Sequence, residues 1–219
     1  MKFEPTPLNI IAKIISGVVH PMLMPLFGAL LIFSLPTNFS MHNEGMVRMY
    51  LLGVIFICTC ILPSIAIIVL KLMGSIEGIG LNEQKDRRIP FILTGICYSI
   101  CYWAILKLDI PRVLFPYALA YPLVLGATLT IILALIVNHW FKISIHMMGI
   151  GGVLGSFIAI AIRFDQPLLP FISILIVLAG LTGFARLQLN AHTPAQVYSG
   201  FIVSAVCNSA LILLPMWLR

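Results

Sequence analysis

Long apolar runs alternate with short polar segments along almost the whole chain. A run of about 18 or more apolar residues with few charges is typical of a helix that spans the ~30 Å hydrocarbon core of a bilayer. The run at 147–162 is short for this purpose, so we expect its helix to begin earlier, near Ile143, or to end in a break. The pattern predicts about six to seven transmembrane segments, over residues 10–35, 49–73, 90–106, 114–137, 147–162, 167–184 and 195–217.

These segments are expected to be helices packed into one bundle. Backbone N–H and C=O groups find no partners in lipid, which leaves helices and closed β-barrels as spanning structures. The chain lacks the alternating segments of about ten residues that mark barrel strands. No tandem repeat or long linker divides it, so we interpret residues 1–219 as a single all-α integral membrane domain, a polytopic transmembrane helix bundle.

Composition supports a multi-pass membrane protein. Of 219 residues, 61% are hydrophobic and 9% are charged, whereas a soluble domain has about 25% charged residues. The net charge of +6 resides mostly in the polar breaks, so we expect anionic membrane lipids or a phosphate substrate as partners, and no nucleic acid. The five cysteines lie inside apolar runs, which indicates buried free thiols rather than disulfides or a zinc site.

Three polar breaks, at residues 74–89, 138–146 and 185–194, follow the second, fourth and sixth apolar runs. If all seven runs cross the membrane, these breaks and the N-terminus lie on one face. Most of the 13 Lys and Arg residues fall on that face. By the positive-inside rule, this distribution favours a cytoplasmic location for it.

The third break combines a fixed positive charge, a histidine and a helix start. Thr193 is a favourable N-cap, Pro194 suits the first helical position, and Gln196 completes a capping box. Arg186 and His192 precede this start, where backbone N–H groups and the helix dipole favour an anion. The break therefore indicates phosphate chemistry at a membrane surface, although Gln196 also has a purely structural explanation in the capping box.

The second break carries Ser144 and His146 just before a glycine-rich run. Gly151 and Gly155 form a small-xxx-small pattern that lets another helix approach closely. An interfacial histidine beside a packing helix is the alternative interpretation of His146.

The first break reads Glu-Gln-Lys-Asp-Arg-Arg-Ile-Pro at residues 83–90. An ordinary charged loop that contacts lipid headgroups would explain it equally well. We assign structural or surface roles to His20 and His42, and an interfacial role to His139 beside Trp140.

Phosphoryl transfer requires cations that hold the charged group, a nucleophile in line, and an acid for the leaving oxygen. The three breaks together supply these groups. Their order resembles the membrane branch of the type-2 phosphatidic acid phosphatase superfamily, whose motifs are Lys…Arg-Pro, Pro-Ser-Gly-His and Ser-Arg-x5-His-x3-Asp. The resemblance covers about residues 85–200.

The third motif matches best, as Arg186, five residues, His192, three residues and Gln196. The second keeps Ser144 and His146 but lacks the proline and glycine. In the first motif, residues 85–90 hold Lys85, Arg87, Arg88 and Pro90 at altered spacing.

This resemblance implies a lipid-phosphate phosphatase of a bacterial inner membrane that uses no metal or other cofactor. His192 would be the nucleophile that forms a phosphohistidine, and His146 would protonate the leaving alkoxide. The remaining assignments also follow from the resemblance: phosphate binding by Arg186 with Lys85 or Arg88, a further hydrogen bond from Ser144, and orientation of the nucleophile by the residue at position 196. The substrate would be an amphiphilic phosphomonoester or diphosphate that enters sideways from the lipid.

Gln196 is the main departure, because the family has an aspartate there. A glutamine oxygen still accepts the Nδ1 proton of a histidine but does not stabilise the imidazolium by charge. By this resemblance, the chain would be a slower or rewired phosphatase, or a relative that binds phosphorylated lipid without turnover; a small transporter is a third alternative. Family members often act on the outer face of the inner membrane, whereas the charge distribution favours the cytoplasmic face.

Overall fold

The computed structural model describes residues 6–35, 44–78, 81, 83–108 and 117–214. Its described residues form helices and turns and contain no strand. Seven helical segments are long and apolar enough to cross a membrane, which confirms the predicted all-α polytopic bundle. The predicted ends at Leu114 and Trp217 lie outside the described residues. The spans are Pro7–Ile32, Gly45–Leu72, Lys85–Leu106, Tyr117–Val137, Ile145–Phe164, Leu169–Gln188 and Pro194–Leu213.

The first span is interrupted inside the bundle. Helix α1 (Pro7–Val18) ends before His20, a short 3₁₀ turn covers Pro21–Leu23, and α2 (Met24–Ile32) continues the span. Pro21 and Pro25 lack the N–H that a continuous helix needs, which explains a break at this position. Thr6 caps the start of α1 by accepting a hydrogen bond from the Asn9 N–H.

The second span contains a matching irregularity. A π-helical turn, Ile57–Ile61, separates α3 (Glu44–Phe56) from α4 (Leu62–Leu72). The Cys60 thiol in this turn donates to the Met22 carbonyl at 3.1 Å and so joins the two irregular segments. A carbonyl at membrane depth needs such a partner because lipid supplies none.

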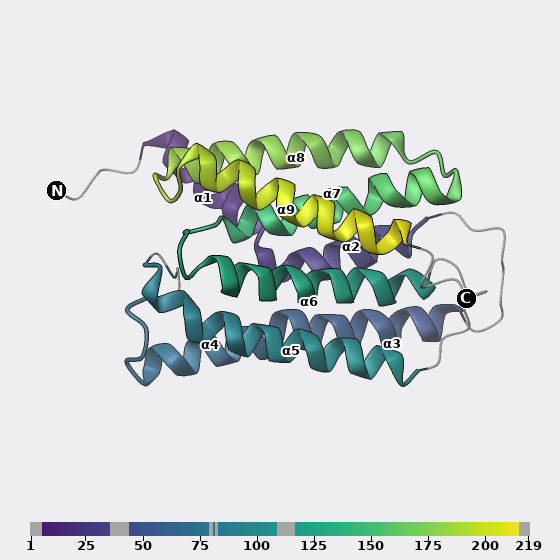
Figure 1. Cartoon of the computed structure of the whole chain (residues 1–219), viewed down its shortest axis with the longest axis horizontal. Helices are drawn as coiled ribbons and strands as arrows, with labels where there is room; N and C mark the ends of the chain where they lie inside the picture. Colours follow the sequence, from purple (N-terminus) through teal and green to yellow (C-terminus); the bar gives the residue numbers. More distant parts are fainter. Residues whose placement is uncertain (1–5, 36–43, 79–80, 82, 109–116, 215–219) are drawn as a thin grey trace.

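Each of the other five spans is a single α-helix, and two of them begin with a short 3₁₀ turn. Helix α7 begins at Ile145, which confirms the earlier start expected for the run at 147–162. The connections α4–α5, α6–α7 and α8–α9 lie at one end of the bundle, together with the start of α1 (Figure 1). Thus the three polar breaks meet in space, as expected. The bounds are α5 (Arg88–Leu106) after a 3₁₀ turn at Lys85–Arg87, α6 (Ala120–Val137) after Tyr117–Leu119, α7 (Ile145–Phe164), α8 (Leu169–Gln188) and α9 (Pro194–Leu213).

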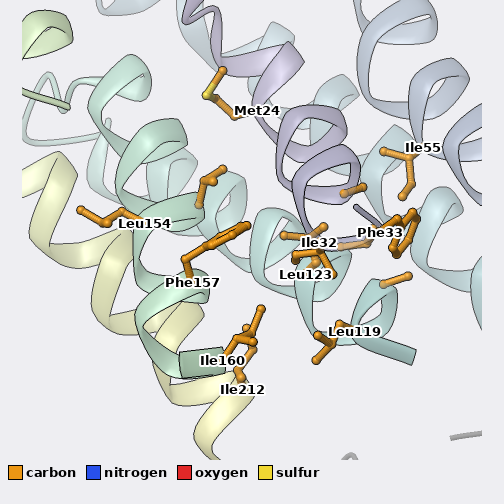
Figure 2. Packing of buried hydrophobic residues seen from close by; sticks show 14 of the residues in the cluster. Met24, Ile32, Phe33, Ile55, Leu119, Leu123, Leu154, Phe157, Ile160 and Ile212 are labelled. Carbon is orange, nitrogen blue, oxygen red and sulfur yellow. The ribbon is translucent and has the colours of Figure 1, made fainter. Parts of the chain in front are cut away.

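Helix α7 lies at the centre of the packing, and two thirds (67%) of its most apolar window is buried. Phe157 points towards the side chains of Ile32 and Leu123, which belong to α2 and α6, whereas Ile160 lies beside Ile212 (Figure 2). On another side, α7 packs against α9 through glycines. A Cβ added to Gly151 would lie 2.6 Å from the Phe201 carbonyl oxygen, so the small-xxx-small prediction is confirmed.

Gly155 offers a direct test of this contact. A Cβ at Gly155 would lie 2.8 Å from the Ala205 Cα, closer than carbon atoms pack. We expect Gly155→Ala to lower the free energy of unfolding by about 1–3 kcal/mol, because the backbone of α9 must move away. Gly180→Ala in α8 is the matched control, since its added Cβ has no atom within 4 Å. Denaturant unfolding in detergent measures both variants, and equal losses would contradict the close α7–α9 contact.

Candidate functional site

A cavity of about 570 Å³ lies inside the bundle below the end where the three breaks meet. This volume is within the range of about 300–1,000 Å³ found for small-molecule sites. Five arginine and histidine side chains line it: His20, Arg87, His146, Arg186 and His192. His20 comes from the first span and Arg87 from the first break. His146 ends the second break in the first turn of α7, and Arg186 and His192 belong to the third break.

The rest of the cavity is mainly apolar and runs along the helices. On α6 its lining extends from Ala134 to Leu123, about 16 Å at 1.5 Å per residue. Phe91 and Val153 line other walls. The cavity therefore reaches about halfway across a ~30 Å hydrocarbon core.

Arg87 is the basic residue of the first break that lines the cavity. It is only 4% exposed. Its Nε donates to the Leu81 carbonyl at 2.8 Å, and its Nη1 donates to the Ile143 carbonyl at 3.1 Å. These two bonds tie the first break to the second and fix the guanidinium in place.

A second pair of hydrogen bonds joins the same two breaks. Gln84 Nε2 donates to the Asn138 carbonyl at 2.5 Å, and Asn138 Nδ2 donates to the Gln84 carbonyl at 3.0 Å. Each residue thus donates a hydrogen bond from its side-chain amide to the backbone carbonyl of the other. This exchange holds the loop that carries Arg87 against the end of α6.

The two phosphate-binding candidates predicted in the first break lie elsewhere. Lys85 is exposed and forms an ion pair with Glu77 at 3.0 Å. Arg88 is also exposed. Successive residues at a helix start point about 100° apart, so the start of α5 turns Arg88 outward and leaves Arg87 facing inward. The structure does not bring Lys85 or Arg88 to the cavity; Arg87 is the basic residue of this break that lines it.

Arg186 lies in the last turn of α8 rather than immediately before a helix start. Cationic side chains are favoured at that end of a helix. Its Nη1 donates to the Ser16 hydroxyl of α1 at 3.3 Å, while its buried Nε has no hydrogen-bond partner among the described residues. Among those residues, neither Arg87 nor Arg186 forms an ion pair with a carboxylate. Within the described part of the chain, the two guanidinium groups of the cavity thus have no carboxylate in direct contact, and the charge of Glu83 acts on Arg87 from a greater distance.

His192 precedes α9 and is 7% exposed. The capping box predicted at this helix start is present. The Gln196 Oε1 atom accepts the backbone N–H of Thr193 at 3.2 Å and lies 3.0 Å from His192 Nδ1. A backbone N–H only donates, so the amide oxygen is the atom that faces both groups.

The Gln196 oxygen in turn determines the tautomer of His192. Because a carbonyl oxygen only accepts, Nδ1 must carry the proton and Nε2 must hold the free lone pair. This Nε2 is buried and has no hydrogen-bond partner among the described residues. The arrangement is the one that a histidine nucleophile requires.

The pKa of His192 is lowered from 6.5 to about 4, mainly because the imidazole is buried. The hydrogen bond to Gln196 opposes this decrease, and the charges of Arg87, Arg186 and Lys142 contribute to it. At neutral pH the imidazole is therefore uncharged, with its lone pair available.

His146 and Ser144 occupy different environments. His146 lies in the first turn of α7, not before it, and lines the cavity; its buried Nδ1 has no hydrogen-bond partner in the described part of the chain. Ser144 is fully buried beside Gln196, where its N–H donates to the Gln196 carbonyl at 3.2 Å. Ser144 is not among the residues that line the cavity.

His20 is the residue of the cavity that sequence reasoning missed. Its ring meets the ring of His146 edge to face, with centroids 5.6 Å apart. An ionisable residue within an apolar span is a signal that could have drawn attention to it. His139 is exposed and packs against Trp140, which agrees with the interfacial role expected for it. His42 lies outside the described residues.

Within the described residues, no group of three or more His, Cys, Asp or Glu side chains could hold a metal ion. The cysteines at positions 58, 60, 97, 101 and 207 are free thiols, as expected from their apolar surroundings. No protein-family model, curated protein or solved structure matches the chain.

The lowered pKa of His192 predicts a specific effect of acid on stability. The folded protein keeps His192 neutral down to about pH 4, whereas the unfolded chain binds the proton near pH 6.5. The unfolded state therefore gains protons first, and stability present above pH 6.5 is lost as the pH falls towards 4. Between neutral pH and about pH 5, we expect the free energy of unfolding to fall by about 2 kcal/mol more than in His192→Gln. Denaturant titrations in detergent at several pH values measure this, and parallel pH profiles of the two proteins would contradict it.

Proposed function

We propose that the protein is a diverged integral membrane lipid-phosphate phosphatase of the type-2 phosphatidic acid phosphatase kind. One observation carries the proposal: Arg87 and Arg186 line the cavity next to the lone pair of His192, and neither forms an ion pair with a carboxylate of the described residues. Burying unpaired cations is expensive, and an anion bound between them would offset that cost. A phosphate group fits because it accepts several charge-assisted hydrogen bonds from guanidinium groups.

The proposed reaction has two steps. In the first, His192 Nε2 attacks phosphorus, a P–N bond forms, and the P–O bond to the alkoxide breaks as His146 supplies the proton. In the second, water attacks the phosphohistidine, the P–N bond breaks, and His146 accepts the proton of that water. Arg87 and Arg186 hold the phosphoryl oxygens throughout and stabilise the charge that develops on them.

The shape of the cavity supports an amphiphilic substrate. Its cationic groups lie near the end of the bundle, whereas its apolar wall follows α6 for about 16 Å from Ala134 to Leu123. A phosphate head at the guanidinium groups would leave the hydrocarbon chain against this wall. A phosphomonoester or diphosphate lipid of the surrounding membrane satisfies both requirements.

Gln196 favours a second candidate, a relative that binds phosphorylated lipid with little or no turnover. The amide fixes the Nδ1 proton of His192 but supplies no negative charge to stabilise the imidazolium. Replacing the aspartate of a serine-protease triad by its amide lowers kcat by about 10⁴-fold, a figure from that unrelated system.

Phosphate release by the purified protein in detergent separates the two candidates. The substrates are phosphatidic acid, phosphatidylglycerophosphate, an isoprenyl diphosphate and a lipid A. A phosphatase should lose its activity in His192→Ala, which lacks the nucleophile, and in His146→Ala, which lacks the acid. If only Gln196→Asp releases phosphate, the native chain is a binding protein built on a phosphatase site. If neither the native protein nor any variant releases phosphate, the result would argue against catalysis.

Arg87 lines the cavity, whereas its neighbour Arg88 is exposed, so Arg88 serves as a matched control for Arg87. We expect Arg87→Gln to lower kcat/KM, or the affinity for dodecyl phosphate, by about 10- to 100-fold, as for loss of a charged hydrogen bond. Arg88→Gln should change either value less than about twofold, because the exposed Arg88 makes no contact with the cavity. Equal effects, or a larger effect of Arg88→Gln, would contradict the placement of the phosphate beside Arg87. Thermal unfolding in detergent checks that Arg87→Gln remains folded.

A further inference from the structure

His20 lies at the point where the first span is interrupted. It follows the end of α1 and precedes the 3₁₀ turn that begins with Pro21. Its side chain caps this turn, because Nδ1 accepts the backbone N–H of Met22 at 3.4 Å. The cap accounts for one of the two ring nitrogens.

The other ring nitrogen of His20 is left for a different partner. Since the Met22 N–H only donates, Nδ1 is the acceptor and the neutral ring carries its proton on Nε2. Among the described residues, no hydrogen bond is made by this Nε2–H. The ring lines the cavity beside Arg186 and His146.

The Nε2–H of His20 faces the cavity, so its acceptor must come from the contents of the cavity, because lipid offers none. Among the described neighbours of His20 in the cavity, none accepts a hydrogen bond from its Nε2–H. Arg186 has donors only, and the His146 ring approaches edge to face at 5.6 Å between centroids. The donors of Arg186 and His20 thus converge on one volume, which an oxygen-rich anion would fill.

We propose that His20 is a further substrate-binding residue, whose Nε2–H donates to a phosphoryl oxygen held by Arg186. This inference rests on the phosphate site proposed above and extends it into the first span. The interruption of that span is then part of the binding site, because it places a side chain from the interior of the helix against the phosphate.

Two isosteric substitutions separate ligand binding by His20 from its capping role. In His20→Asn the amide oxygen replaces Nδ1, so the cap of the 3₁₀ turn is retained and the Nε2–H donor is lost. In His20→Gln the longer side chain places an amide N–H near the position of Nε2. His139→Asn is the control for a histidine at the same end of the bundle that is exposed and outside the cavity.

The experiment measures kcat/KM for phosphate release and, independently of turnover, the affinity of each purified variant for dodecyl phosphate in detergent. We expect His20→Asn to lose about 10- to 100-fold in kcat/KM and in dodecyl phosphate affinity, the usual effect of one hydrogen bond to a charged group. His20→Gln should recover most of that loss, and His139→Asn should match the native protein. Thermal unfolding should show His20→Asn as stable as the native chain.

Other outcomes overturn the inference. If the native protein binds dodecyl phosphate and His20→Asn binds it equally well, His20 serves as a cap only. The same conclusion follows if both His20 variants lose binding in proportion to a loss of thermal stability. If the native protein neither releases phosphate nor binds dodecyl phosphate, the proposed function itself fails, and the role of His20 fails with it.

Discussion

The burial of two guanidinium groups is the constraint on which the rest of the site depends. A cation in a helix bundle of low polarity must be held by fixed acceptors or by an anion. Arg87 satisfies part of this need with the carbonyls of Leu81 and Ile143, and Arg186 with the Ser16 hydroxyl. Those bonds join the first break to the second and the third break to the first span, and the Ser144 N–H, which donates to the Gln196 carbonyl, joins the second break to the start of α9.

The structure shows that Gln196 is both part of the helix cap and the hydrogen-bond partner of His192. A single oxygen accepts both the Thr193 N–H and the His192 Nδ1–H, since a carbonyl has two lone pairs. The start of α9 therefore fixes the tautomer of the histidine. In a cavity lined by two guanidinium groups, a neutral amide at position 196 preserves the positive potential. An aspartate would weaken that potential while stabilising a cationic His192, so in the proposed phosphatase this position would exchange phosphate affinity against turnover.

The spans and the third break could be predicted from the sequence because both depend on local patterns. Apolar length gives the spans, and the capping box gives the start of α9. The contact between His192 and Gln196 was expected only from the family resemblance. Arg87 could not be distinguished from Lys85 or Arg88 in this way, because the residue that faces inward depends on where α5 begins. A shift of one residue turns a helix by about 100°, which is finer than a hydropathy pattern resolves. His20 was missed for a different reason, since only the tertiary fold brings the first span to the second and third breaks.

The interrupted first span links the shape of the cavity to its chemistry. A continuous helix through Pro21 would point its backbone donors along its own axis and offer the cavity only side chains of a regular face. The break instead ends α1 at the level of Arg186, places Ser16 and His20 beside it, and leaves the Met22 carbonyl to the thiol of Cys60. The π-helical turn that carries Cys60 is the second irregularity needed for this arrangement. Two local departures from regular helix thus support each other and create a polar pocket that opens onto an apolar wall, a combination that fits an anionic headgroup with a hydrocarbon chain better than a water-soluble anion.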